Sequence, residues 1–169
     1  MADRLTASAA RLLGEALSAS GSTVAVAESC TGGLLGGAIT SIPGSSLYFS
    51  GGVVAYRNSA KISLLGVPPD LIAAHGAVSR EVALAMAEGI LALFRADLAI
   101  AITGVAGPGG GSRGKPAGTV WVAVAAAGGV RYAHRYRFPG GRDAVRREAV
   151  KASLGAAIDV LHSGSEEAR

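Results

Sequence analysis

One serine, one tyrosine and one lysine lie close enough along the chain to form a nucleophile with its base. Ser46 precedes an apolar segment, Tyr56 ends that segment, and Lys61 falls in the first turn of the next predicted helix. These side chains can converge at one edge of a sheet. There the serine can attack a carbonyl carbon while the lysine accepts its proton.

A lysine activates a serine only as an uncharged amine. Lowering its pKa from about 10.4 to about 7.5 costs on the order of 4 kcal/mol. The segment around Lys61 carries little charge, and Asn58, three residues earlier, is the predicted helix cap, so the helix dipole disfavours a cation here. Both features lower the pKa. A lysine that extends into solvent is the alternative interpretation.

A second candidate is the turn 28–33, with the sequence Glu-Ser-Cys-Thr-Gly-Gly, between a predicted strand and a predicted helix. The free amides at a helix start can hold a phosphate or a developing oxyanion, and glycines let a ligand approach the backbone. An ordinary helix cap at Thr31 explains the same residues. Cys30 has no histidine near it in sequence to activate it, and a small buried thiol is the more common case.

The third candidate is a glycine-rich segment, residues 103–118, with seven glycines and two prolines. Successive amides in such a segment can form a nest for a phosphate or a carboxylate. The segment lacks both the Gly-Lys-Ser/Thr of a phosphate-binding loop and the dinucleotide-binding fingerprint, which disfavours nucleoside-triphosphate hydrolysis. A merely flexible loop is the competing interpretation.

Metal chemistry has little support in the sequence. His75, His134 and His162 lie far apart without ligand spacing, and a single cysteine builds neither an internal disulfide nor a thiolate metal site. We therefore expect neither a metal nor a cofactor. The net charge is +4, and residues 131–151 hold seven basic side chains against two acidic ones. Such a segment attracts anions or is a solvated strand and helix face.

Hydrophobic periodicity predicts the elements that must position these residues. Helices are expected over 5–18, 31–40, 58–65, 68–74, 79–94 and 143–161, and strands over 23–27, 47–56, 97–102, 119–125 and 131–138. Ser79 is expected to cap the helix over 79–94. This order predicts an α/β protein: a single three-layer α/β/α domain with a mixed sheet of parallel and antiparallel neighbours.

Length and composition are typical of one globular domain. The chain has 169 residues, of which 50% are hydrophobic and 17% charged, and this excludes a largely disordered protein. We expect one domain over 1–169 with a frayed tail from residue 163. No continuous apolar run of 18 residues is present, so no transmembrane helix is expected. No secretory signal is visible, which predicts a cytoplasmic protein.

Five segments of the chain resemble one known family. They are AESCTGG at 27–33, GSSLYFSGGVVAYRNSAK at 44–61, HGAVS at 75–79, ITGVAGPGGGS at 102–112 and KPAGTVW at 115–121. In this order they resemble the competence-damage-inducible CinA C-terminal family. That family includes nicotinamide-nucleotide amidohydrolases, which convert nicotinamide mononucleotide to nicotinate mononucleotide and ammonia in pyridine-nucleotide recycling.

The resemblance implies a metal-free serine amidohydrolase with a Ser/Lys dyad. On this basis we expect Ser46 as the nucleophile, Lys61 as the base and Tyr56 as the residue that orients Lys61 or relays its proton. Ser29 is the alternative nucleophile. The expected substrate contacts are Thr31, Gly32, Thr103, Gly104 and Gly107, with Arg142 or Arg146 at the phosphate. A homodimer acting on a small nucleotide is the family-based expectation.

Two other functions are compatible with the same residues. A non-catalytic pyridine-nucleotide-binding or interaction module needs the glycine-rich segments but no neutral lysine. Nucleic-acid binding is a further interpretation, because Arg131, Arg135 and Arg137 alternate on one strand face beside Tyr132 and Tyr136. The basic residues of the strand and of the following helix need not share a face, so no nucleic acid is expected as a partner. No membrane is expected either, because the chain lacks a continuous apolar run.

Overall fold

The computed structural model describes residues 4–167 of the chain. Its strands are β1 (Val24–Glu28), β2 (Phe49–Val54), β3 (Leu98–Gly104), β4 (Thr119–Ala126) and β5 (Arg131–Arg137). Its helices are α1 (Arg4–Ser20), α2 (Leu34–Thr40), α3 (Asn58–Leu65), α4 (Pro69–His75), α5 (Arg80–Phe94) and α6 (Arg142–Glu167), with one 3-10 turn, η1 (Ser45–Leu47).

The strands form one mixed sheet in the order β2-β1-β3-β4-β5. β1 runs parallel to both β2 and β3, whereas β4 is antiparallel to β3 and to β5. The carboxyl ends of β1, β2 and β3 therefore meet at one edge of the sheet. Such an edge is where open α/β sheets commonly hold their ligands.

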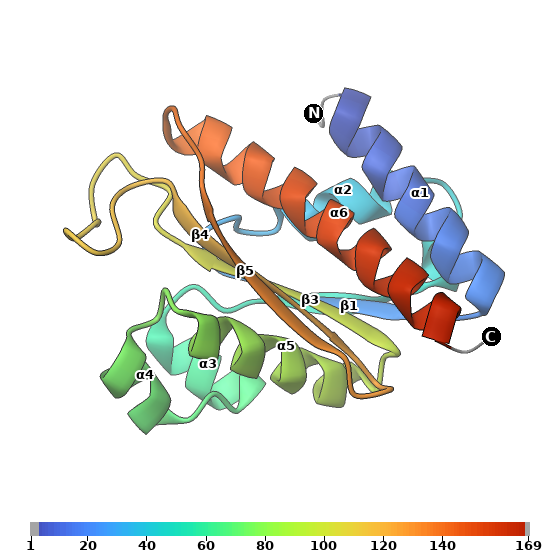
Figure 1. The fold of residues 1–169 in the computed structure, drawn as a ribbon, viewed down its shortest axis with the longest axis horizontal. Helices are drawn as coiled ribbons and strands as arrows, with labels where there is room; N and C mark the ends of the chain where they lie inside the picture. The colour runs from blue at the N-terminus through green and yellow to red at the C-terminus, as the bar shows by residue number, and fades with distance from the viewer. Residues whose placement is uncertain (1–3, 168–169) are drawn as a thin grey trace.

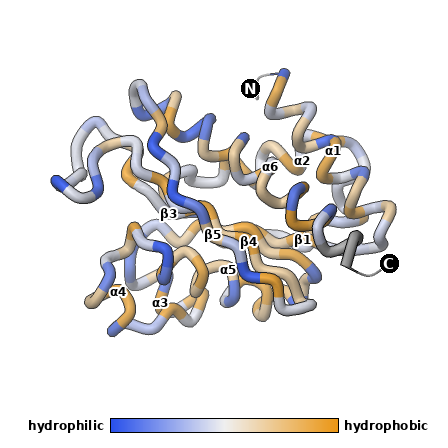
Figure 2. Tube along the Cα trace, viewed as in Figure 1, coloured by the Kyte–Doolittle hydropathy of each residue, from blue (hydrophilic) through white to orange (hydrophobic). Residues whose placement is uncertain are grey.

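Helices cover both faces of the sheet (Figure 1): α1, α2 and α6 on one face, and α3, α4 and α5 on the other. The predicted α/β class with a mixed sheet is confirmed. In Figure 2 the central strands are mostly hydrophobic, β5 is largely hydrophilic, and the helices carry residues of both kinds.

The two faces of the sheet differ in side-chain size. β1 and β3 alternate a large apolar residue with alanine, so that Val24, Val26 and Ile100 face α1, α2 and α6, while Ala25 and Ala99 face α5. Successive strand residues point to opposite faces, which makes this alternation a direct consequence of the sequence. The alanine face lets α5 pack close to the sheet backbone.

Some helix ends differ from the sequence prediction. α2 begins at Leu34 rather than at residue 31, because Gly32 and Gly33 have φ values of 58° and 97°, a left-handed conformation that a right-handed helix cannot contain. Asn58 is the first residue of α3 and not its cap. The predicted cap at Ser79 is confirmed, since its Oγ accepts a hydrogen bond from the Val82 amide at 3.3 Å.

The C-terminal helix is longer than its hydrophobic pattern predicted. α6 continues to Glu167, through most of the segment that was predicted to fray from residue 163. Residues 168 and 169 lie outside the described part of the chain. The polar composition of 163–167 carries no apolar periodicity, and periodicity was the only helix signal used there.

Candidate active site

Ser29 and Lys61 meet at the carboxyl edge of the parallel strands. Ser29 directly follows β1, and Lys61 lies in α3, which follows β2. The Lys61 residue is 1% exposed, and its Nζ lies 3.1 Å from Ser29 Oγ. The same Nζ donates to the carbonyl oxygens of Ala55 at 2.9 Å and Tyr56 at 3.2 Å. Two polar side chains from different elements are thus in contact at a buried position.

These three contacts match the bonding capacity of an uncharged amine. An ammonium has three N–H donors, and the loss of one proton leaves two donors and a lone pair. The carbonyls of Ala55 and Tyr56 can take the two hydrogens, which leaves the lone pair facing Ser29 Oγ. The Ser29 hydroxyl can then donate its proton to Nζ.

The surroundings of Lys61 also favour the neutral form. Burial lowers the pKa of Lys61 below its ordinary value, with a smaller opposing effect from nearby Cys30. Among the residues that the structure describes, no carboxylate forms an ion pair with this lysine. The amine therefore has no negative partner that would hold it in the charged form.

Ser46 lies at the opposite end of the strands, where β1 and β2 begin. It belongs to η1, before β2, and the register pairs Phe49 at the start of β2 with Val24 at the start of β1. Ser46 is therefore separated from Ser29 and Lys61 by the length of the strands, and it is exposed and outside the cavity that Lys61 lines. Within one chain, the structure brings Lys61 to Ser29 and not to Ser46.

Tyr56 contacts Lys61 through its backbone only. Its phenol oxygen accepts a hydrogen bond from Arg142 Nη2 at 2.9 Å, and the residue is 56% exposed. Arg142 also donates from Nη1 to the Gly107 carbonyl at 3.1 Å. The expected proton relay through the phenol thus has no contact with the amine in this structure. Tyr56 and Arg142 instead join the β2 end of the site to the glycine-rich segment.

A cavity of about 330 Å³ opens at Ser29 and Lys61. It is lined by Ser29, Cys30, Tyr56, Asn58, Lys61, Ala77, Val78, Thr103, Gly104, Val105, Ala106, Gly107, Gly109, Gly110 and Arg142. The buried Thr103 donates from Oγ1 to the Ala77 carbonyl at 2.9 Å and so ties the end of β3 to the connection between α4 and α5. The volume falls at the lower end of the range for small-molecule sites.

The turn 28–33 does not present the start of α2 to this cavity. The buried Glu28 carboxylate accepts hydrogen bonds from the amides of Gly33 at 3.0 Å, Leu35 at 3.1 Å and Gly36 at 2.8 Å. The positive end of the helix is thus already occupied by a negative side chain. The sequence alone did not reveal that Glu28, at the end of β1, points back to these amides.

Three of the expected substrate contacts lie outside the cavity. Thr31, Gly32 and Arg146 do not line it, whereas Thr103, Gly104, Gly107 and Arg142 do. Arg146 approaches the turn from α6 and donates to the Thr31 carbonyl at 2.9 Å. The cavity also includes Asn58, Ala77 and Val78, which were not predicted as site residues. The only sequence signal for Ala77 and Val78 was the HGAVS segment.

Cys30 lies beside Ser29 and Lys61 but is not an activated nucleophile. Burial raises the pKa of its thiol to about 11, and the negative charge of Glu28 adds to this effect. A thiol with that pKa stays protonated at neutral pH and is a weak nucleophile. Within the described residues, no group of three or more His, Cys, Asp or Glu side chains could hold a metal ion.

The basic strand β5 separates its charges from its aromatic rings. Tyr132 and Tyr136 pack against the hydrophobic core beneath α6. Arg131, on the opposite face, pairs with Glu88 at 2.7 Å, and Arg135 donates to the Gly114 carbonyl at 2.7 Å. Stacking of bases needs exposed rings beside the charges, and this arrangement does not provide them. No helix in the described part of the chain is both long and apolar enough to cross a membrane.

Comparison with known proteins identifies the family of this chain. The family model for the CinA C-terminal domain matches residues 6–161. The chain belongs to the CinA C-terminal domain family. It is 42% identical to the competence/damage inducible protein CihA from Agrobacterium tumefaciens, whose crystal structure superposes with a TM-score of 0.93 over 96% of this chain and 98% of that one.

Relatives in this family differ in length. A CinA-like protein of Synechococcus sp. is 53% identical over 90% of this chain, but the match spans only 36% of that relative. The nicotinamide-nucleotide amidohydrolase PncC of Escherichia coli is 51% identical over 84% of this chain and 86% of its own length. The chain thus corresponds to about a third of the longer CinA-like proteins and to most of PncC.

Proposed function

We propose that this protein is an amidohydrolase that removes ammonia from nicotinamide mononucleotide to give nicotinate mononucleotide. The contact between Lys61 Nζ and Ser29 Oγ carries the proposal, because it supplies a base to a hydroxyl inside a small cavity. The name and extensive identity of the Escherichia coli relative support the substrate class. Ser29, the alternative in the sequence analysis, takes the place of Ser46 as nucleophile.

In the first step, the neutral Lys61 amine takes the proton of the Ser29 hydroxyl while Oγ attacks the carboxamide carbon. The carbonyl oxygen becomes an oxyanion. The backbone bonds of the turn use the amides of Ser29, Gly32 and Leu34. This leaves the amide of Cys30, directly after the nucleophile and at the wall of the cavity, as the donor that we assign to the oxyanion.

In the second step, the carbon–nitrogen bond of the tetrahedral intermediate breaks. The Lys61 ammonium returns its proton to the departing nitrogen, which leaves as ammonia, and an ester on Ser29 remains. A water molecule then loses a proton to Lys61 and attacks the ester carbon. Lys61 passes this proton to the Ser29 oxygen as the ester bond breaks, so the lysine is again neutral. The product leaves as a carboxylic acid, which loses its remaining proton to solvent and becomes the carboxylate.

The phosphate of the substrate is assigned to Arg142 and the glycine-rich segment. Arg142 lines the cavity, bonds to Tyr56 and Gly107, and forms no ion pair with a carboxylate in the described residues. A guanidinium without a carboxylate partner is suited to an anion. Thr103, Gly104 and Gly107 line the cavity beside Arg142.

A homodimer and a cytoplasmic location remain part of the proposal. Exposed apolar side chains at the edge of the sheet support the dimer: Leu47 is 82% exposed before β2, and Val54, at the end of β2, is 50% exposed. A second copy packed against this edge strand would cover them. Analytical ultracentrifugation measures the mass in solution, and a monomer at micromolar concentration would contradict the dimer.

Ammonia release from nicotinamide mononucleotide tests the catalytic proposal. Ser29→Ala should lower turnover at least about 1000-fold, since it removes the nucleophile, while the matched Ser46→Ala should remain within about threefold of the wild type. The reverse result would reject Ser29. Calorimetric binding of the nucleotide by the wild type without ammonia release would favour a non-catalytic binding module instead.

A further inference from the structure

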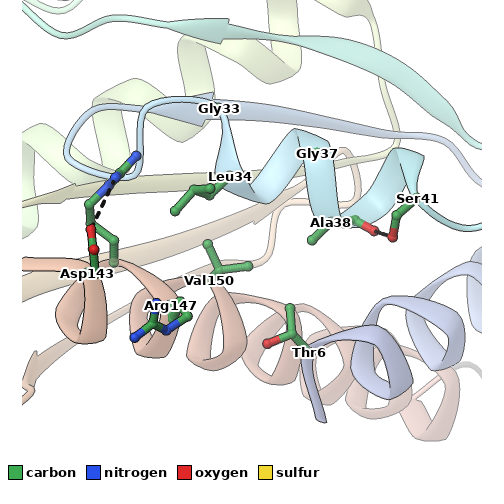
Figure 3. Close-up of a pocket in the computed structure, with 10 residues that line it drawn as sticks. Thr6, Gly33, Leu34, Gly37, Ala38, Ser41, Asp143, Arg147 and Val150 are labelled. Atoms are coloured by element: carbon green, nitrogen blue, oxygen red, sulfur yellow. Dashed lines mark hydrogen bonds and ion pairs between the residues drawn. The ribbon is translucent and has the colours of Figure 1, made fainter. Parts of the chain in front are cut away.

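A second and larger cavity lies away from the catalytic pair. It has a volume of about 550 Å³ and shares no lining residue with the cavity at Ser29. Figure 3 shows it between α2 on one side and α6 with α1 on the other. Leu34 of α2 and Val150 of α6 contribute apolar side chains from opposite sides. A space of this size matches a small organic ligand.

Gly37 keeps the α2 side of this cavity open. A Cβ built at Gly37 would meet no atom within 4 Å, and the residue is in an ordinary helical conformation. Glycine inside a helix costs about 1 kcal/mol relative to alanine, and no close packing at this position requires it. With Gly33 and Ala38, it gives α2 a flat surface on which a planar or aliphatic group can lie.

The cavity is cationic at one end. Arg146 and Arg147 line it together with one acidic residue, Asp143, which lies 3.8 Å from Arg146. Arg147 forms no ion pair within the described residues, and the Nε of Arg146 is buried without a hydrogen-bond partner there. The Arg147 side chain is exposed at the cavity and has no carboxylate partner in the described residues, so an anionic ligand would find a free guanidinium at this end.

The same arginine connects this cavity to the catalytic turn. Arg146 Nη2 donates to the Thr31 carbonyl at 2.9 Å, and a Cβ on Gly32 would lie 3.4 Å from that nitrogen. Gly33, the last residue of the turn, lines the cavity itself. A ligand that binds Arg146 therefore acts on the backbone two residues after Ser29.

We propose that this cavity binds a small organic anion, an apolar ring or chain that carries a carboxylate, sulfonate or phosphate, and that its occupancy adjusts the turn holding Ser29. The apolar body lies between Leu34 and Val150, and the anionic group contacts Arg146 and Arg147. The binding site does not depend on the proposed deamidation. The effect on the Ser29 turn does.

Fluorescence titration of the full chain with 8-anilinonaphthalene-1-sulfonate tests the site, because this probe combines aromatic rings with a sulfonate. Gly37→Leu fills the cavity and should weaken binding at least tenfold. Gly155→Leu is the matched control, since Gly155 is also helical with no atom within 4 Å of its Cβ and does not line the cavity. Arg147→Gln should weaken binding of the probe at least threefold. This second variant tests the site even if Gly37→Leu fails to fold.

Equal affinity in the wild type, Gly37→Leu and Arg147→Gln would overturn the site, as would an absence of saturable binding. Ammonia release then tests the connection to Ser29. Saturating probe should change turnover at least twofold in the wild type and not in Gly37→Leu. Unchanged wild-type turnover with saturable binding would overturn the effect on the turn while leaving the site in place, and failure of deamidation itself would not alter the titration.

Discussion

Replacement of Lys61 by methionine should change how the stability of the protein depends on pH. The unfolded chain keeps a lysine protonated up to about pH 10.4, whereas burial lowers the pKa of Lys61 in the folded state. Between these two pKa values, unfolding takes up a proton. The free energy of unfolding of the wild type should therefore rise with pH across this window, by up to about 1.4 kcal/mol per pH unit.

The size of this slope follows from the site. Lys61 is 1% exposed and has no carboxylate partner in the described residues, so no ion pair offsets the cost of burying its charge. Lys61→Met also leaves the carbonyls of Ala55 and Tyr56 without a donor, at about 1–3 kcal/mol each. That loss does not vary with pH, so the difference in slope between the two proteins isolates the amine.

Urea unfolding followed by circular dichroism, in steps from pH 7 to pH 10, measures the slope. Lys151→Met removes a partly exposed lysine of α6 that pairs with Glu148, and it should leave the slope of the wild type in place. A stability difference between wild type and Lys61→Met that is flat or falls with pH would refute the interpretation that the folded protein favours the uncharged amine.

Four further substitutions test contacts in the structure. Arg142→Gln should raise KM for nicotinamide mononucleotide about tenfold and leave KM for the riboside without phosphate unchanged; equal effects on both substrates in steady-state assays would contradict its role at the phosphate. Glu28→Gln should lower the free energy of unfolding by about 1–3 kcal/mol, because an amide replaces a carboxylate oxygen that accepts from the start of α2; an unchanged urea midpoint would contradict this. Gly89→Ala should destabilise by more than about 2 kcal/mol, since its Cβ would overlap the Leu65 carbonyl, whereas Gly37→Ala, which meets nothing within 4 Å, should stabilise by up to about 1 kcal/mol; similar thermal shifts for both would refute the packing argument.

The sequence predicted the mixed sheet and drew attention to Lys61 because both depend on local patterns. The β1 and β3 segments are short apolar runs bounded by polar turns, and such runs are typical of buried strands. Lys61 was singled out by its position after β2 and by the low charge around it. The structure contains these strands and places Lys61 directly after β2. Neither observation depends on the exact register between distant segments.

The choice of serine could not be made in the same way. Ser46 precedes β2 and Tyr56 follows it. Because a strand rises about 3.3 Å per residue, the two residues lie near opposite ends of β2. The parallel pairing of β1 with β2 then brings Ser29, and not Ser46, beside the end of β2. That pairing joins segments far apart in sequence, and no local pattern specifies it.

The alanine layer on the α5 face of the sheet has a consequence for evolution of the site. Lys61 reaches Ser29 from α3, α3 packs on α5 through the close approach of Leu65 to Gly89, and α5 rests on alanine methyl groups such as those of Ala99 and Ala101. Methyl groups have no rotamers with which to absorb a change in volume. Any enlargement of this layer would lift the two helices together and pull the amine away from the hydroxyl, so residues remote from the substrate set the reach of the base.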